Sequence, residues 1–278
     1  MRLTRLTHLG RFIGHLAGSR HVVDRSASVN GWESLAVFLS GVVAGSVNAV
    51  VGAGTLVTFS TLITVGIPPL TANVSNTVGL AAGSVASSVG YRPELRQQRA
   101  RLRWLLPASV LGGLTGAGLL LVLPDKTFDA VVPVLVLTGV VLVFVQPRLA
   151  ARLETPHDVS NRGSGWVWLG VFVTGVYGGY FGAAQGVLLI ALLGTLVDAH
   201  LQRVNALKNA LAAAVNLVAA AVFIAVGSVD WTVALLLVVG SMIGGYFGAH
   251  YGRRLPATLL RWFIALVGLV AVVLLVVR

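Results

Sequence analysis

Residues 41–77 read GVVAGSVNAVVGAGTLVTFSTLITVGIPPLTANVSNT. This stretch is strongly apolar, yet Asn48, Gly52 and Gly54 interrupt it midway, and a Pro-Pro pair followed by two asparagines closes it. Polar side chains and loosened backbone inside a membrane are costly unless they line a cavity or meet a partner. The stretch therefore predicts one half of a substrate site rather than a simple membrane anchor.

The composition of the chain is that of an integral membrane protein. Hydrophobic residues make up 56% of the 278 positions and charged residues only 10%, whereas soluble domains carry about 25% charged residues. A spanning helix needs roughly 20 mostly apolar residues. Runs without Asp, Glu, Lys or Arg cover residues 34–91, 104–124, 130–147, 163–197, 209–229, 231–252 and 262–277. We therefore expect an all-α integral membrane protein with about eight transmembrane helices.

The charge pattern and the absent residue types exclude several functions. The chain has no cysteine, which excludes disulfides and thiol chemistry. Its net charge of +11 lies in the gaps between apolar runs, which is typical of topology signals beside an anionic membrane surface and not of nucleic-acid binding. The sequence has no phosphate-binding loop, metal-ligand cluster or nucleophile triad, so we expect no enzymatic activity, no cofactor and no metal.

Basic and polar segments divide the chain into four parts. Residues 1–33 form a basic tail, whose pattern fits a short interfacial helix and an unstructured tail equally well. We expect a first membrane repeat at 34–146, a polar linker at 147–165 and a second membrane repeat at 166–278. The sequence leaves open whether the protein forms a homo-oligomer.

The second membrane segment matches the first at an offset of 130–132 residues. A constant offset over four spans indicates a duplication. Secondary transporters are commonly built from two such repeats, with the substrate site between them. Gly45, Gly52 and Ala53 match Gly175, Gly182 and Ala183, and Gly112, Gly113, Gly116 and Pro124 match Gly244, Gly245, Gly248 and Pro256.

Each repeat is expected to begin with a broken helix. The charge-free run at 34–91 has 58 residues, about 18 more than two spans need, and the run at 163–197 has 35 residues, about 15 more than one span needs. Both excesses lie beside glycine clusters at corresponding places. Interrupted helices at matching positions indicate a transport site, and the free backbone N–H groups of a broken helix attract anions.

The arginines predict the orientation of the chain in the inner (plasma) membrane. The loop at 92–103 holds five arginines and one acidic residue, and short loops rich in arginine stay cytoplasmic. Alternating spans then give a multi-pass protein with a cytoplasmic N-terminus. In this arrangement Arg253 and Arg254 would face outward, and a re-entrant fifth span would remove that conflict. The sequence leaves this choice open.

Lys208 is the charged residue that lies inside an apolar stretch and not close to its ends. A lone cation at membrane depth costs several kcal/mol unless it is paired or neutralised. With no carboxylate of similar depth nearby in the sequence, a bound anion would be a suitable partner. The alternative is that the lysine extends to the membrane surface.

Uncharged polar residues and glycines at both breaks complete the candidate substrate site. Amides and hydroxyls can donate hydrogen bonds to an anion without carrying charge. The alternative for each polar side chain is a helix–helix hydrogen bond. Gly112 with Gly116, and Gly240 with Gly244 and Gly248, instead predict close helix packing. The candidate site residues beside Lys208 are Asn48, Gly52, Gly54, Thr55, Asn73, Asn76, Thr77, Gly182, Gln185, Asn205, Asn209 and Asn216.

The sequence resembles the TauE/SafE-type sulfite exporter group, also called the toluene sulfonate uptake permease family. The resemblance covers about residues 34–277 and rests on GIPPLTANVSNT, NALKNALAAAVNLVAAAVFIAVGSVDW and GSMIGGYFGAHYGRRL. It implies two four-helix repeats and the transport of small sulfur-containing anions such as sulfite or sulfonates. The breaks differ from the denser glycine clusters of many members, because they read VGAGT at 51–55 and GAAQG at 182–186.

These observations predict a secondary transporter, and more specifically an exporter, of a small anion such as sulfite or an organosulfur anion. Its partners would be that anion and the lipid bilayer. Two alternatives remain open: a membrane scaffold or assembly factor that transports nothing, and a passive anion channel.

Overall fold

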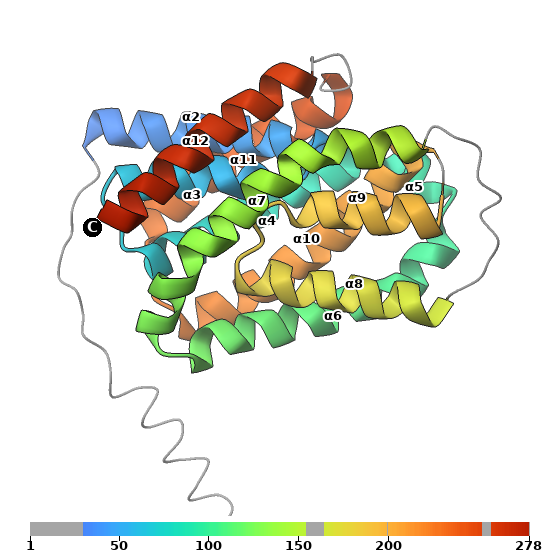
Figure 1. Ribbon diagram of the computed structural model, residues 1–278, viewed down its shortest axis with the longest axis horizontal. Helices are drawn as coiled ribbons and strands as arrows, with labels where there is room; N and C mark the ends of the chain where they lie inside the picture. The colour runs from blue at the N-terminus through green and yellow to red at the C-terminus, as the bar shows by residue number, and fades with distance from the viewer. Residues whose placement is uncertain (1–29, 154–163, 199, 252–256, 278) are drawn as a thin grey trace, which may run out of the picture. The chain divides into compact units, whose positions relative to one another are not determined.

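A computed structural model of the chain describes residues 30–153, 164–198, 200–251 and 257–277. Over these ranges the protein consists of helices and connecting turns without a β-strand, so the expected all-α fold is confirmed (Figure 1). The predicted basic tail lies outside the described residues up to position 29, as do residues 154–163 of the predicted linker. The helices are α2 (Gly31–Val50), α3 (Gly54–Thr64), α4 (Pro69–Gly90), α5 (Arg92–Arg96), α6 (Arg99–Val122), α7 (Asp125–Leu153), α8 (Ser164–Tyr180), α9 (Gln185–Leu196), α10 (Leu201–Val226), α11 (Trp231–Tyr251) and α12 (Ala257–Val277).

Five helices are long and apolar enough to cross a membrane: α2, α6, α7 as far as Gln146, α10 and α11. The helices α3 and α9 and the Trp262–Val277 part of α12 are apolar but shorter. Helix α4 has 22 residues, and its Ser, Thr, Asn and Gly content goes with burial among other helices instead of contact with lipid. The chain is thus a multi-pass membrane protein. The count of eight spans and the division into two repeats stay predictions.

Both predicted helix breaks are present, and the helices before them, α2 and α8, end in the same backbone hydrogen-bond pattern. At the end of α2, the N–H groups of Val51 and Gly52 both donate to the carbonyl of Val47, at 2.7 and 3.0 Å. At the end of α8, those of Phe181 and Gly182 both donate to Tyr177, at 3.0 Å each. Gly52 and Gly182 have φ angles of 85° and 74°, a conformation that costs glycine little and other residues more.

After each break the chain turns back along the helix it has just left. A methyl group added to Gly170 of α8 would meet the side chain of Leu192, and one added to Gly178 would meet that of Gln185. The short helix α9 therefore runs antiparallel to α8, as Figure 1 shows. Likewise, Gly54 at the start of α3 lies against Ala44 of α2. Neither α2–α3 nor α8–α9 continues as one straight helix.

Glycine faces allow the long helices to approach each other closely. A methyl group on Gly244 or Gly248 of α11 would overlap the backbone of α2, at Val42 and Ser46 respectively. Gly112 and Gly116 of α6 lie equally close to the backbone of α8. Small residues at this spacing permit such approach in membranes. The packing role predicted for both glycine sets is therefore confirmed.

Each half of the chain packs its first helix against the other half. Helix α2 lies against α11, and α8 lies against α6. The short helices follow the same rule, since α3 contacts α12 and α9 contacts α7. This exchange brings the ends of α2 and α8, which are far apart in the chain, to the same region of the interior.

Candidate functional site

The two helix breaks touch each other. The N–H of Gly186 donates to the carbonyl of Gly52 at 3.1 Å, and a methyl group on either glycine would overlap the backbone of the other. A cavity of about 20 Å³ lies at this contact. Because one water needs roughly 10–15 Å³, the cavity in this conformation has room for one or two water-sized groups. Its walls are formed by Asn48, Gly52, Thr55, Ser84, Gly182, Gln185, Gly186, Lys208, Asn209, Ala212 and Asn216.

Lys208 is buried in the wall of this cavity, with 1% of its surface exposed. Its amine donates to the backbone carbonyls of Asn48 and Ala49, at 3.0 Å each, and the side-chain amide of Asn209 donates to Ala49 at 3.1 Å. These carbonyls belong to the last turn of α2, where intrahelical partners are lacking and the helix dipole is negative. The alternative of a lysine that reaches the membrane surface does not fit this burial.

The helices α3 and α9 both begin at the cavity. The side-chain oxygen of Asn48 accepts a hydrogen bond from the N–H of Gly54 at 3.0 Å and so holds the start of α3. Thr55 follows in the first turn, where N–H groups have no partner within the helix. Gln185 opens α9, and its side-chain nitrogen is buried without a hydrogen-bond partner among the described residues.

The charges around the cavity favour an anion. The start of a helix carries roughly half a positive charge, and two helices start here beside Lys208. The ends of α2 and α8 also lie at the two breaks and offset part of this positive charge, while the wall contains no carboxylate. The wall offers amide, hydroxyl and amine groups as hydrogen-bond donors. This arrangement can therefore bind a small anion that presents several oxygen acceptors.

The structure brings together eight of the thirteen residues predicted for the site and leaves the other five outside the cavity wall. Gly54 is hydrogen-bonded behind the wall, and Asn73 donates to the carbonyl of Tyr180 at 2.9 Å, at the end of α8. The hydroxyl of Thr77 donates to the carbonyl of Asn73. Asn76 and Asn205 are 1% and 4% exposed. The eight in the wall are Asn48, Gly52, Thr55, Gly182, Gln185, Lys208, Asn209 and Asn216.

Three further residues line the cavity and were not predicted: Ser84, Gly186 and Ala212. Ser84 accepts a hydrogen bond from the side chain of Asn216 at 2.8 Å, which joins α4 to α10. The two positions are 132 residues apart, which is the offset of the predicted repeat. Applying that offset to Asn216 would have identified Ser84.

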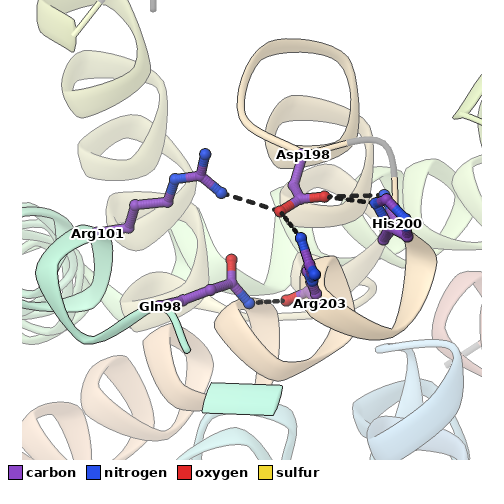
Figure 2. A network of polar contacts seen from close by, with 5 residues as sticks. All are labelled: Gln98, Arg101, Asp198, His200 and Arg203. Carbon is purple, nitrogen blue, oxygen red and sulfur yellow. Dashed lines mark hydrogen bonds and ion pairs between the residues drawn. The ribbon is translucent and has the colours of Figure 1, made fainter. Parts of the chain in front are cut away.

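A second polar cluster joins the start of α6 to the connection between α9 and α10 (Figure 2). Asp198 is 6% exposed and accepts a hydrogen bond from Arg101 at 2.9 Å, with Arg203 at 3.8 Å. The His200 ring lies 3.3 Å from the other oxygen of Asp198. Gln98 donates to the carbonyl of Arg203 at 2.9 Å. The cluster fixes Gln98 and the first turn of α6 to Asp198 and the first turn of α10.

Comparisons with known proteins give one family match and several related membrane proteins. A model of the family described as sulfite exporter TauE/SafE matches residues 37–275. A "Probable membrane transporter protein" of Haemophilus influenzae is 27% identical over 81% of this chain and 87% of its own length. A protein of Sinorhizobium named "Probable membrane transporter protein ORF9" is 24% identical, over 84% of this chain and 88% of its own. "Probable membrane transporter protein YfcA" of Escherichia coli K12 is 23% identical, over 84% and 86%. No solved structure gives a significant match.

Proposed function

Because the chain belongs to the sulfite exporter TauE/SafE family, we propose that it is a secondary transporter that moves sulfite or an organosulfur anion out of the cell. The observation that carries the proposal is the cavity between the two helix breaks, which is walled by Lys208, amides and hydroxyls without a carboxylate. The oxygens of a sulfite or sulfonate group would accept hydrogen bonds from Gln185, Thr55 and Lys208. Asn73, Asn76, Thr77, Asn205 and Gly54 would support the site from behind.

The packing supports a transporter of two inverted repeats with eight membrane segments. Each half would comprise a bent-back hairpin (α2–α3 or α8–α9) and three long helices. Under the offset of about 130 residues, α2 corresponds to α8 and α11 to α6, so the α2–α11 and α8–α6 contacts are equivalent. Three crossings after each hairpin would place the second half in the opposite orientation. In other transporters, alternating access arises from one repeat rocking against the other.

The charges support an orientation for these repeats in the inner membrane. Tyr91, Ala206 and Ala249 cluster with Ala49, so the ends of α2, α4 and α11 lie together, beside the arginine-rich loop at 92–103. Glu33, Asp125 and Asp230 start helices at the opposite ends. We propose that the arginine-rich end faces the cytoplasm. The chain then enters the membrane at Gly31 from the outer side. This is the reverse of the cytoplasmic N-terminus expected from alternating straight spans.

Transport into proteoliposomes tests the function. We expect saturable flux of sulfite or a sulfonate with the full-length protein, and a loss of at least tenfold in apparent affinity in Gln185→Ala and Thr55→Val. Thr115→Val is the matched control, because its hydroxyl is exposed on α6 and donates only within its own helix. An absence of flux for every sulfur anion and carboxylate tried would favour a scaffold. Flux without saturation or dependence on an ion gradient would favour a passive channel.

A further inference from the structure

The ends of α2 and α8 have equivalent backbones but different partners. In α2, the carbonyls of Asn48 and Ala49 accept hydrogen bonds from Lys208 and Asn209. The corresponding carbonyls of α8, 130 positions later, are those of Gly178 and Gly179. They receive no hydrogen bond from the residues that the structure describes, because the N–H groups of Phe181 and Gly182 both donate to Tyr177. The last turn of α8 therefore presents carbonyl oxygens that receive no hydrogen bond from the described residues, and the side-chain amide of Gln185 lies against Gly178.

The residue that corresponds to Lys208 is Asn76. Each is the eighth residue of its helix, α10 or α4. Asn76 is 1% exposed, and its side-chain oxygen has no hydrogen-bond partner among the described residues. The position that carries a cation in one half therefore carries a buried oxygen acceptor in the other half.

Asn73 adds a second unpaired oxygen at the same helix end. Its side-chain nitrogen donates to the carbonyl of Tyr180 at 2.9 Å, which holds the amide against the end of α8. Its side-chain oxygen is buried and has no partner within the described chain. A buried acceptor without a donor costs about 1–3 kcal/mol. Several such atoms grouped at the negative end of a helix dipole suit a positive ion.

We propose that the end of α8, with the side-chain oxygens of Asn73 and Asn76 and the carbonyls of Gly178 and Gly179, binds an alkali metal cation that takes the place of the Lys208 ammonium in the other half. Neutral amide and carbonyl oxygens suit a hard monovalent ion such as Na⁺ or K⁺, whereas a divalent ion would need carboxylates. No acidic residue is among these ligands. Given the anion transport proposed above, this cation is the coupling ion.

Cation-dependent thermal unfolding of the full-length protein in detergent tests the site without any transport. Samples in NaCl, KCl and choline chloride at equal ionic strength separate specific binding from screening. For wild type we expect a saturable rise in Tm of about 2–4 °C in NaCl or KCl over choline at roughly five times Kd. The salt that gives the rise identifies the ion. Equal Tm values in all three salts overturn the proposal.

Variants locate the response. Asn76→Lys supplies a covalent ammonium, so the rise should disappear, whereas Asn76→Asp adds a negative charge and should lower the half-saturating cation concentration at least tenfold. Thr138→Val, a lipid-facing control on α7, should respond like wild type. If Asn76→Lys does not fold, Asn76→Asp still decides. An unchanged half-saturating concentration in Asn76→Asp overturns the site.

The cation site and the transport function fail separately. A Tm response without any anion flux would leave the cation site standing and remove the proposed transporter. Saturable anion flux that is equal in Na⁺, K⁺ and choline, together with an unresponsive Tm, would keep the transporter and remove the cation site.

Discussion

The N–H of Gly186 donates to the carbonyl of Gly52 over 3.1 Å, which joins two helix breaks whose glycines are 134 positions apart in the chain. Both glycines line the cavity, and at their contact the backbones of the two breaks touch directly. A conformational change that separates the hairpins α2–α3 and α8–α9 must open this contact. The two glycines therefore hold the helix breaks together at the wall that also contains Lys208.

Replacing Gly52 by alanine should destabilise the protein strongly. Its φ of 85° costs an alanine about 1–3 kcal/mol, and the added methyl group would overlap Gly186. We expect a clear fall in Tm, or loss of folded protein, in fluorescence-detected size exclusion. Gly118→Ala is the control, since nothing lies within 4 Å of its added methyl group, and this variant should be as stable as wild type or more stable. Equal stability of both variants would contradict the role of the Gly52–Gly186 contact.

Two substitutions of Lys208 should separate its structural role from its charge. Lys208→Met leaves the Asn48 and Ala49 carbonyls with fewer donors, at a cost of about 1–3 kcal/mol for each unpaired group, so Tm should fall. Lys208→Gln keeps a donor but loses the charge, so its Tm should be closer to wild type while anion transport falls at least tenfold. Full transport in a folded Lys208→Gln protein would exclude a role for the charge.

The Asp198 cluster should contribute measurable stability. Asp198→Asn removes the ion pairs to Arg101 and Arg203, whose side chains are each 44% exposed. We expect a loss of about 1 kcal/mol, read as a fall in Tm that shrinks in high salt. A double-mutant cycle with Arg101→Gln measures the coupling between these two side chains. Arg92→Gln is the control; it replaces an exposed arginine of the loop at 92–103 and should change Tm little. A coupling energy of zero between Asp198 and Arg101 would contradict the contact.

Single cysteines test the proposed orientation on a chain that has none of its own. A cysteine at Lys126, in the first turn of α7, should react with a membrane-impermeant maleimide added to intact spheroplasts. A cysteine at Arg96, in α5, should react only after permeabilisation. The reverse labelling pattern would restore a cytoplasmic N-terminal side, and labelling of both from outside would contradict the assignment of the two positions to opposite ends.

The sequence was sufficient to predict the helix breaks but not the direction of the chain after them. Glycines inside overlong charge-free runs located both breaks, because glycine and polar residues weaken an apolar helix at the point where they interrupt it. Whether α9 continues α8 or returns along it depends on contacts such as that of Gly170 with Leu192. The order of apolar and polar residues along the chain does not predict such contacts. Ala184, with a φ of 57°, also adopts a backbone conformation that its residue type disfavours.

The candidate site was predictable in its chemistry but not in its internal pairing. Lys208 was identified because it is a buried cation in an apolar segment. Its partners are backbone carbonyls 160 and 159 residues away, and backbone atoms carry no sequence signature. Asn73 and Thr77 were grouped with the cavity residues, but the structure joins Asn73 to the end of α8, and Thr77 donates to the carbonyl of Asn73 within α4.

The packing of α2 on α11 determines when the protein can mature during its synthesis. The hydroxyl of Ser46 donates to the carbonyl of Gly244 at 3.0 Å, across 198 residues of sequence. At about 5–20 residues per second, the ribosome needs roughly 10–40 s to make α11 after α2 has emerged. During that interval α11 does not yet cover the glycine face of α2. Lipid, a helix made before α11 or the insertion machinery must cover it instead. A chain that stops before α11 would retain this unprotected surface, so quality control should remove incomplete products.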